Sequence, residues 1–392
     1  MTPVDNQQLC TFTVTLQGQP IVVIARSERP VGNRVSPASM LLAEAVSLPS
    51  TSHVLMLGCG CGALAALLAR QLSTGSVGLI DINIGALNLA QQTLQANAIH
   101  NASIITEISV LPEGAESFDA VVIEAPQGRR LIRRWLLEAY CALRPGGQLY
   151  LAGPNDQGVR PAIADAEALF GNMTPLGYKA RHRVARFVKN PSRANLPDWV
   201  AEPGIAPGTW VEFDLVVRGE TFRLCGLPGV FAYNKLDAGT QLLLEHMVPP
   251  SGARVLDIGC GYGIIGLVAS RQDVAAVDLV DANLLAVAAT KRNIARNDIA
   301  IAQAWACDIR DGLGASRYDC VVTNPPFHSG KEVNYDIAHA FIIQARAALK
   351  PGGQLVLVAN RFLRYERVMQ PIFTFVDRIA ETKSYQVLAG TC

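Results

Sequence analysis

The sequence contains an internal repeat, in which the second half follows the first with an offset of about 200 residues. The segment from Val54 to Gly62 matches the segment from Val255 to Gly263, and each reads as an apolar strand that ends in a glycine-rich turn. The matches continue in the same order: Asp81-Ile82-Asn83 with Asp281-Ala282-Asn283, Phe118–Val122 with Tyr318–Val322, and Arg144–Leu149 with Lys350–Leu355. A repeat of this length indicates the duplication of a whole domain rather than a solenoid.

The repeat therefore predicts two α/β domains, in which strand-like runs alternate with helix-length segments. At 392 residues the chain is long enough for both. We expect the first domain over residues 1–190, a linker over residues 191–208 and the second domain over residues 209–392. The expected linker is marked by its prolines, which are Pro191, Pro197, Pro203 and Pro207.

Composition excludes several classes of protein. Apolar residues make up 50% of the chain and charged residues 17%, which favours sizeable cores over disorder. No run of about 20 uncharged apolar residues predicts a transmembrane helix, and Met1–Cys10 lacks the pattern of a secretory signal. The nine cysteines are scattered, which suits free thiols in a reducing cytoplasm and predicts no metal site. We expect a cytoplasmic protein, present as a monomer or weak dimer.

The glycine-rich turn of the second half has the features of a ligand site. Gly259, Gly261 and Gly263 allow the backbone to approach a ligand closely and to adopt positive φ. The spacing differs from the dinucleotide-binding fingerprint, and Asp257 precedes the glycines. A carboxylate there would repel a pyrophosphate, so it suits a cationic ligand better.

Two further acidic residues follow predicted strands in the second half. Asp281 ends the strand after the glycine-rich turn and is followed by Asn283. An acid at this point of a doubly wound sheet is the usual partner of a ribose diol. Asp308 lies at the end of the next strand. These side chains are expected at the sheet edge where such folds bind ligands.

The most informative short motif is Asn324-Pro325-Pro326-Phe327, which follows the apolar strand Cys320–Thr323. Two successive prolines end the strand and project Asn324 and Phe327 from its carboxyl end. The Asn324 amide oxygen and the Pro325 carbonyl can accept hydrogen bonds from an exocyclic amine, while the Phe327 ring can stack on the attached base. Alone, an Asn-Pro-Pro sequence is a common turn, so its interpretation depends on the motifs that precede it.

Residues 225–390 resemble the class I S-adenosylmethionine-dependent methyltransferases. The fold class implied is two tandem Rossmann-like class I methyltransferase domains. In this resemblance, Asp257, Gly259, Gly261 and Gly263 form the first cofactor-binding motif. Asp281 is the acid that binds the ribose, with Asn283 beside it, and Asp308 is the residue that reads the adenine amine. Asn324, which begins the target-amine motif, is also assigned to cofactor binding. The resemblance assigns the transfer step to Asn324, Pro325, Pro326 and Phe327. The implied cofactor is S-adenosylmethionine.

The first half is a degenerate copy. Met56 replaces Asp257, and Glu124-Ala125-Pro126-Gln127 replaces the Asn-Pro-Pro-Phe motif. Met56 offers no carboxylate, and Gln127 cannot stack as an aromatic ring can. Asp81 and the glycines remain, so residual cofactor binding is left open. We interpret this half as a fold retained for shape or for RNA binding after its chemistry was lost.

Basic residues form two clusters in the first half, although the whole chain has a formal charge of only +1. One cluster contains Arg129 and Arg130, and the other, residues 179–189, contains Arg181 and Arg183 and no acidic residue. Solvated basic faces are common, but an enzyme that acts on nucleic acid needs phosphate contacts of this kind. We favour RNA contact for both clusters.

Longer motifs narrow the resemblance to the RsmC/RlmG group of ribosomal RNA guanine-N2 methyltransferases. These motifs are Asn324–Gly330, Leu227–Phe231 with Lys235–Leu243, and Val358–Tyr365. The group pairs a degenerate amino-terminal domain with an active carboxyl-terminal one, and small-subunit RNA is the favoured target. The resemblance adds His328, Lys331 and Arg361 as weaker candidates for contact with the substrate.

The predicted activity is methyl transfer to the N2 amine of a guanine in ribosomal RNA, free or within a ribosomal subunit. Four alternatives stay open: a guanine of large-subunit RNA, adenine N6, a protein glutamine, and a non-catalytic RNA-binding factor in ribosome assembly. The identity of the labelled product would distinguish the enzymatic alternatives. The paired retention of Asp257 and Asn324 argues against loss of catalysis in the second half.

Overall fold

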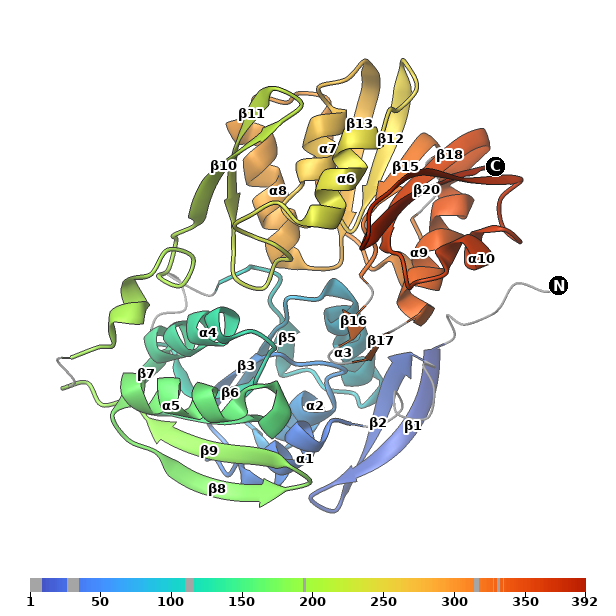
Figure 1. Cartoon of the computed structure of the whole chain (residues 1–392). Helices are drawn as coiled ribbons and strands as arrows, with labels where there is room; N and C mark the ends of the chain where they lie inside the picture. The colour runs from blue at the N-terminus through green and yellow to red at the C-terminus, as the bar shows by residue number, and fades with distance from the viewer. Residues whose placement is uncertain are drawn as a thin grey trace. The chain divides into compact units, whose positions relative to one another are not determined.

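A computed structural model shows two compact units, Met1–Thr209 and Trp210–Cys392, coloured blue to green and yellow-green to red in Figure 1. It describes residues 9–26, 35–109, 116–192, 195–313, 317–326, 328–329, 332–333 and 335–392. Each unit contains a seven-stranded mixed sheet with helices on its faces. The prediction of two Rossmann-like α/β domains is therefore confirmed.

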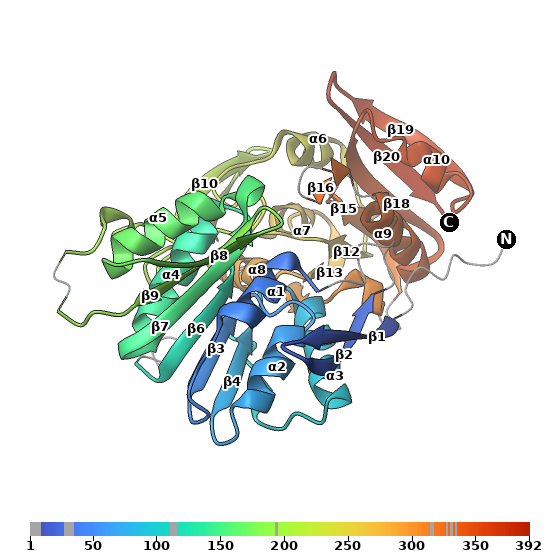
Figure 2. The same cartoon turned by 90° about the horizontal axis from the view of Figure 1, so that it is seen from below.

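The first unit begins with a hairpin and continues as alternating helices and strands. Its elements are β1 (Leu9–Leu16), β2 (Gln19–Arg26), α1 (Pro37–Ala45), β3 (His53–Leu57), α2 (Ala63–Gln71), β4 (Ser76–Ile80), α3 (Ile84–Ala96), β5 (Ala102–Ile104), β6 (Phe118–Glu124), α4 (Arg129–Ala142), β7 (Leu143–Pro154), η1 (Asn155–Gln157), α5 (Val159–Phe170), β8 (Thr174–Lys179), β9 (His182–Val188) and η2 (Asp198–Ala201). Helices α1 to α3 lie on one face of the sheet and α4 and α5 on the other (Figure 2).

The second unit repeats this plan. Its elements are β10 (Val211–Val217), β11 (Glu220–Gly226), α6 (Ala238–His246), β12 (Ala253–Ile258), α7 (Ile264–Ala269), β13 (Val274–Asp281), α8 (Leu284–Arg296), β14 (Ala302–Ala306), η3 (Ile309–Asp311), β15 (Tyr318–Thr323), β16 (His328–Ser329), β17 (Glu332–Val333), α9 (Tyr335–Ala348), β18 (Leu349–Asn360), α10 (Tyr365–Met369), β19 (Phe375–Glu381) and β20 (Tyr385–Thr391). The short pair β16–β17 forms a separate two-stranded sheet.

The strand order of the two sheets is the same, position by position. The order is β5-β4-β3-β6-β7-β9-β8 in the first unit and β14-β13-β12-β15-β18-β20-β19 in the second. The first five strands of each sheet are parallel, and the last two run antiparallel to their neighbours. The chain direction across the sheet reverses between β12 and β15, and ligands of such sheets bind at the carboxyl ends of the strands there.

Buried apolar side chains of the parallel strands form the core of the second unit. One cluster joins β12, β15, β18 and β20 to helices α9 and α10, and it includes Leu256, Val321, Leu355 and Ile342. All four are 1% exposed or less. Near-continuous apolar runs are typical of parallel strands covered on both faces. This rigid core holds the strand ends that carry the polar residues predicted from the sequence.

The repeat extends further toward the amino terminus than the sequence comparison could place it. Hairpin β1–β2 packs on α3, and β10–β11 packs on α8 (Figure 1). The Asn97 amide exchanges hydrogen bonds with both backbone groups of Val22, at 3.1 and 2.6 Å. The Asn297 amide does the same with Arg223, at 3.0 and 2.9 Å. Each hairpin is therefore held by the same device, one asparagine at the end of a helix.

The segment 191–208 was predicted as a linker, and its described residues include several that pack on the first unit. Trp199 of η2 is only 7% exposed. The Arg133 guanidinium lies over the Trp199 ring, 5.3 Å from its centroid, and Arg134 donates a hydrogen bond to the Gly204 carbonyl at 3.2 Å. The division between the units accordingly falls after Thr209.

Candidate functional site

The glycine-rich turn between β12 and α7 has the backbone conformation that the sequence predicts. Gly259, Gly261 and Gly263 have φ values of +72°, +58° and +95°. A Cβ atom on Gly263 would lie 2.9 Å from Thr290, and one on Gly259 would lie 3.1 Å from the Phe341 ring. No atom lies within 4 Å of a Cβ on Gly261. Two glycines are thus required by packing, while the third leaves open space above the backbone.

Asp257 lies at the end of β12 and is completely buried. Its Oδ2 atom accepts a hydrogen bond from the Gly266 amide at 3.0 Å. Its Oδ1 atom is buried without a hydrogen-bond partner among the residues that the structure describes. Burial, together with the nearby Asp281 carboxylate, raises the pKa of this carboxyl to about 8, although the hydrogen bond from the Gly266 amide lowers it. A buried acid with one unused oxygen suits a site that receives a cation.

Asp281 closes the glycine-rich turn. Its Oδ2 atom accepts from the Gly261 amide at 2.9 Å, and its Oδ1 atom accepts from the Asn283 amide at 2.8 Å. Burial raises the pKa of Asp281 to about 6, and the amide donors lower it. The Asn283 side chain caps α8 at Leu285 (2.9 Å) and donates to the Gly229 carbonyl at 2.8 Å. The Asn283 side chain therefore acts on the site indirectly, by fixing the backbone at the start of α8 and at Gly229.

Asp308 follows β14 and is 3% exposed. Its two carboxylate oxygens accept hydrogen bonds from the Arg310 guanidinium at 2.9 and 2.8 Å, and Oδ1 also accepts from the Arg310 amide at 3.0 Å. Sequence reasoning did not assign Arg310, although its position two residues after Asp308 is the signal that could have found it. The bidentate pair holds the carboxylate in one orientation.

Asn324 follows β15, and its side chain is half-buried. Its Nδ2 atom donates to Thr240 Oγ1 at 2.9 Å and lies 3.4 Å from Asp237 Oδ2. Pro325 is buried and Pro326 is exposed. Because Nδ2 faces these two residues, the amide oxygen Oδ1 points away from them, on the opposite edge of the planar amide group, where it can accept a hydrogen bond. Sequence reasoning used Asp237 and Thr240 only to recognise a motif and assigned them no role.

Three of the predicted contact residues cannot be compared with a described side chain. Phe327 and Lys331 lie outside the described residues, and of His328 only the backbone, in β16, is described. Their predicted roles stay predictions.

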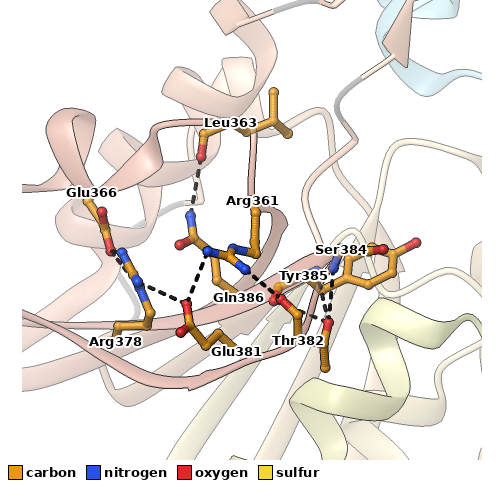
Figure 3. A network of polar contacts seen from close by, with 9 residues as sticks. All are labelled: Arg361, Leu363, Glu366, Arg378, Glu381, Thr382, Ser384, Tyr385 and Gln386. Carbon is orange, nitrogen blue, oxygen red and sulfur yellow. Dashed lines mark hydrogen bonds and ion pairs between the residues drawn. The ribbon is translucent and has the colours of Figure 1, made fainter.

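Arg361 belongs to a polar network at the turn between β19 and β20 (Figure 3). Its amide donates to the Ser384 carbonyl at 2.9 Å, and its guanidinium donates to the Thr382 carbonyl at 3.3 Å. The guanidinium also lies 3.8 Å from Glu381, which pairs with Arg378 at 2.9 Å. Arg361 is thus partly neutralised, although its side chain is 47% exposed.

The equivalent site of the first unit keeps the backbone geometry. Gly58, Gly60 and Gly62 have φ values of +82°, +52° and +80°. Asp81 accepts from the Gly60 amide at 3.2 Å and from the Asn83 amide at 2.9 Å, as Asp281 does in the second unit.

The side chains that differ in the first unit are those expected to carry chemistry. Met56, which replaces Asp257, is 3% exposed. Glu124, which replaces Asn324, accepts a hydrogen bond from Ser39 at 2.7 Å. The Trp135 ring lies 3.1 Å from the position of a Cβ on Gly58, where the second unit has Phe341. The fold of this site is retained, while its carboxylate and amide have been exchanged for other groups.

The two basic clusters of the first unit differ in their surroundings. Arg129 forms a bidentate pair with Asp165 at 2.9 and 2.8 Å, and Arg130 pairs with Glu202 at 2.5 Å. Arg133 also pairs with Asp165 at 3.0 Å and lies 3.6 Å from Glu202, so two carboxylates offset part of the charge of three arginines. The contact of Arg129 and Arg130 with RNA stays a prediction.

The second cluster lies on the hairpin β8–β9. The Arg183 guanidinium lies over the Tyr178 ring, 5.0 Å from its centroid, and donates to Asn155 at 2.9 Å. The Tyr178 side chain is 60% exposed. Arg181 occupies the turn between the strands with φ +62° and is exposed. An exposed ring stacked on a cation is a chemically suitable contact for a nucleic-acid base.

Within the described ranges, no helix is long and apolar enough to span a membrane. The same residues contain no group of three or more His, Cys, Asp or Glu side chains arranged to hold a metal ion.

Comparison with known proteins gives consistent matches over both units. The family model described as "Methyltransferase small domain" matches residues 31–186 and 221–389. A protein of Marinomonas sp. named "Ribosomal RNA small subunit methyltransferase C" is 32% identical over 291 residues, which cover 71% of this chain and 78% of the relative. A protein of the same name from Shewanella loihica is 29% identical over 363 residues, covering 91% and 99%.

A solved structure matches nearly the whole chain. It is described as "T. Thermophilus 16S rRNA N2 G1207 methyltransferase (RsmC) in complex with AdoMet and Guanosine". The TM-score is 0.79 at 28% sequence identity, and the match covers 98% of each chain. The two-unit architecture is therefore shared with a protein whose structure holds both a methyl donor and a guanine nucleoside.

Proposed function

The chain belongs to the methyltransferase small domain family and to the ribosomal RNA small subunit methyltransferase C proteins, and we propose that it methylates the N2 amine of a guanine in 16S ribosomal RNA. The observation that carries this proposal is the orientation of Asn324 at the end of β15. Its amide nitrogen is held by Thr240 at 2.9 Å, so its oxygen is available to accept a hydrogen bond from an exocyclic amine.

The second unit fits the cofactor S-adenosylmethionine. The Oδ1 atom of Asp257 has no hydrogen-bond partner among the described residues, and Gly261 leaves open space over the turn. Asp281 stands at the strand end where a ribose diol would be bound, and Asp308 at the end of the next strand is suited to an adenine amine. When bound, S-adenosylmethionine supplies an electrophilic methyl group, so that the amine nitrogen gains the methyl carbon as the carbon–sulfur bond breaks and one amine proton leaves.

The chain's own contribution to transfer is the handling of the amine. A guanine N2 lone pair is delocalised into the ring, which makes the nitrogen a poor nucleophile. Hydrogen bonds from this amine to Asn324 Oδ1 and to the Pro325 carbonyl would hold it in position and stabilise the positive charge that develops on nitrogen. Phe327 would stack on the base after it leaves its helix or loop. No nucleophilic side chain is needed for direct transfer.

The experiment that tests this function uses the full-length protein with methyl-labelled S-adenosylmethionine. Small subunits, large subunits, free 16S RNA and free 23S RNA are incubated separately, and the RNA is digested to nucleosides. Label in N2-methylguanosine from the small subunit or from 16S RNA is the expected result. Label in the large-subunit RNA, in N6-methyladenosine or in a protein glutamine would replace the proposed substrate, and binding of the cofactor with no label would favour an assembly role.

We also propose that the hairpin β8–β9 of the first unit contacts RNA. Residues 174–188 contain Lys179, Arg181, Arg183 and Arg186 and no acidic residue. The equivalent hairpin of the second unit, residues 375–391, contains two acidic and two basic residues. Its Arg378 donates hydrogen bonds to Glu381 within the hairpin and to Glu366 of α10. Positive charge that is not balanced within its own hairpin is suited to phosphates. A protein that acts on ribosomal subunits is expected to be located in the cytoplasm.

A further inference from the structure

The first turn of helix α6 reaches the side chain of Asn324. Asp237 caps this helix, and its Oδ2 atom accepts from the Thr240 amide at 2.9 Å. The Thr240 hydroxyl accepts from Asn324 Nδ2 at 2.9 Å, and Asp237 Oδ2 lies 3.4 Å from the same nitrogen. Thr240 is 6% exposed, so this contact is sheltered from water. Two side chains more than 80 positions away in sequence thus determine the surroundings of the amide.

Of the two neighbours of Asn324, only the Asp237 carboxylate by itself favours the amide nitrogen over the amide oxygen. The Thr240 hydroxyl donates to Asp237 Oδ2 at 3.4 Å, which leaves its lone pairs to accept from Asn324 Nδ2. Without the carboxylate, a threonine hydroxyl can donate or accept and would bind either the nitrogen or the oxygen of Asn324. The Asp237 carboxylate can only accept. Rotating the amide by half a turn would bring its oxygen to within about the same 3.4 Å of Asp237 Oδ2, and two acceptors would then repel each other. Asp237 therefore selects the orientation in which Nδ2 faces α6 and Oδ1 faces away from it.

The first unit contains an equivalent contact between a helix start and a strand end, but there the carboxylate lies at the strand end. Ser36 caps α1 and accepts from the Ser39 amide at 2.9 Å, in the place of Asp237 and Thr240. The Ser39 hydroxyl then donates to Glu124 Oε2 at 2.7 Å. Where the strand end carries a carboxylate, the helix cap is a neutral serine, and where the strand end carries an amide, the cap is a carboxylate. Each unit keeps one carboxylate in the contact, and only the second unit presents a fixed amide.

We propose that Asp237, together with Thr240, is the positioning residue that holds the Asn324 oxygen toward the target amine. This inference rests on the proposed function, because it assigns the orientation that an amine substrate requires. Asp237 acts through Asn324. Loss of the carboxylate should allow both amide orientations, and the inverted one would present N–H donors to an amine that also donates.

The test compares two pairs of variants in the full chain. Asp237→Asn can keep an oxygen at the cap of α6, where Oδ2 now accepts from the Thr240 amide, but it removes the negative charge beside Asn324 Nδ2 and so weakens the preference for one amide orientation. We expect kcat at saturating 16S RNA or small subunits to fall by roughly two- to fivefold, because the inverted amide orientation would then hold a large share of the molecules. Thr240→Val removes the hydroxyl at nearly equal volume and should also lower kcat, whereas Thr240→Ser should restore it. The Kd for S-adenosylmethionine should stay within about twofold of the wild-type value.

The first unit supplies the matched control. Ser36→Asn also exchanges the capping side chain at the equivalent helix start, and Ser39→Ala removes the equivalent hydroxyl. Both should leave kcat unchanged while shifting Tm by an amount comparable to that of the α6 variants. A wild-type kcat for Asp237→Asn would overturn the proposal. A fall in kcat that is accompanied by an equal loss of cofactor affinity would also overturn it, because the effect would then be a general loosening of the site.

A second measurement tests the orientation of the Asn324 amide without any RNA substrate. Selective 15N labelling of asparagine side chains reports the Asn324 NδH2 group, which is assigned by its absence in Asn324→Ala. Protected, slowly exchanging protons in the wild type and faster exchange in Asp237→Asn support the positioning role. Identical exchange in both proteins refutes it. If the wild-type protein labels no guanine, the proposed function fails, while this comparison still decides whether Asp237 orients the amide.

Discussion

Replacing the buried carboxyl of the cofactor site by an amide should stabilise the protein in a way that grows with pH. Asp257 is completely buried, and its pKa is raised from 3.8 to about 8. Between these values the folded chain keeps the proton on Asp257 while the unfolded chain has lost it. The stability contributed by the neutral carboxyl is therefore lost progressively as pH rises from about 4 to about 8.

The size of the effect follows from the shift. A difference of 4.2 units, which is 8 minus 3.8, corresponds to about 6 kcal/mol at 1.36 kcal/mol per unit once the pH exceeds 8. Asp257→Asn has no proton to lose, so the difference in unfolding free energy between variant and wild type should rise by about 1.4 kcal/mol per pH unit between pH 5 and pH 7. Other buried acids, including Asp281 with its pKa near 6, cancel in this difference.

The assay is urea denaturation of the full-length proteins at half-unit pH intervals from 5 to 9, followed by circular dichroism. Binding of S-adenosylmethionine is measured on the same samples. The wild type should bind the cofactor more tightly as pH rises toward 8, since the ionised carboxylate attracts a cation, and the variant should bind weakly at every pH. A stability difference that does not change with pH would refute the reasoning.

The first unit allows the reverse experiment. Met56 occupies the equivalent buried position, 3% exposed. Met56→Asp should introduce the same dependence of stability on pH, without any gain in cofactor binding. The methionine side chain does not ionise, so Met56 contributes no such dependence of stability on pH.

Three further predictions concern the rest of the site and the RNA surface. Asn324→Ala should abolish methyl transfer and leave the calorimetric Kd for S-adenosylmethionine nearly unchanged, and loss of both together would contradict the assigned role. Gly261→Ala and Gly263→Ala should both lower Tm because both glycines have positive φ, and Gly263→Ala should lower it more because its Cβ would lie 2.9 Å from Thr290. No atom of the described residues lies within 4 Å of a Cβ on Gly261, so a methyl group there would occupy the open space over the turn and Gly261→Ala should also weaken cofactor binding. Arg181→Gln and Arg183→Gln should each reduce the slope of log affinity for 16S RNA against log salt by about 1 if each contacts a phosphate, and an unchanged slope would exclude the hairpin.

Local sequence patterns were sufficient for the architecture. An apolar strand, three glycines and a helix-length segment recur at matching positions in both halves, so duplicated α/β domains could be predicted without any contact information. The same patterns placed Asp257, Asp281 and Asn324 at strand ends, because the end of an apolar run and a proline or glycine after it are visible in the sequence. These predictions depend only on near neighbours in the chain.

Partners that are distant in sequence were decided by the tertiary structure. The basic residues Arg129 and Arg130 were predicted to contact RNA, and folding also brings them to Asp165 and Glu202, 36 and 72 positions away. Nothing in their local pattern carries that information, since a cation and its counter-ion need no fixed spacing. The hairpins β1–β2 and β10–β11 escaped comparison because their strands share few residues, and the asparagines that hold them, Asn97 and Asn297, lie at the ends of α3 and α8.

The orientation of Asn324 shows the same division most clearly. The sequence by itself determined that an asparagine follows β15 and that prolines turn the chain there. It could not determine which end of the amide faces a ligand, because that depends on a carboxylate 87 positions earlier. Folding brings the cap of α6 against the end of β15, and electrostatic repulsion between two acceptors then fixes the orientation of the amide.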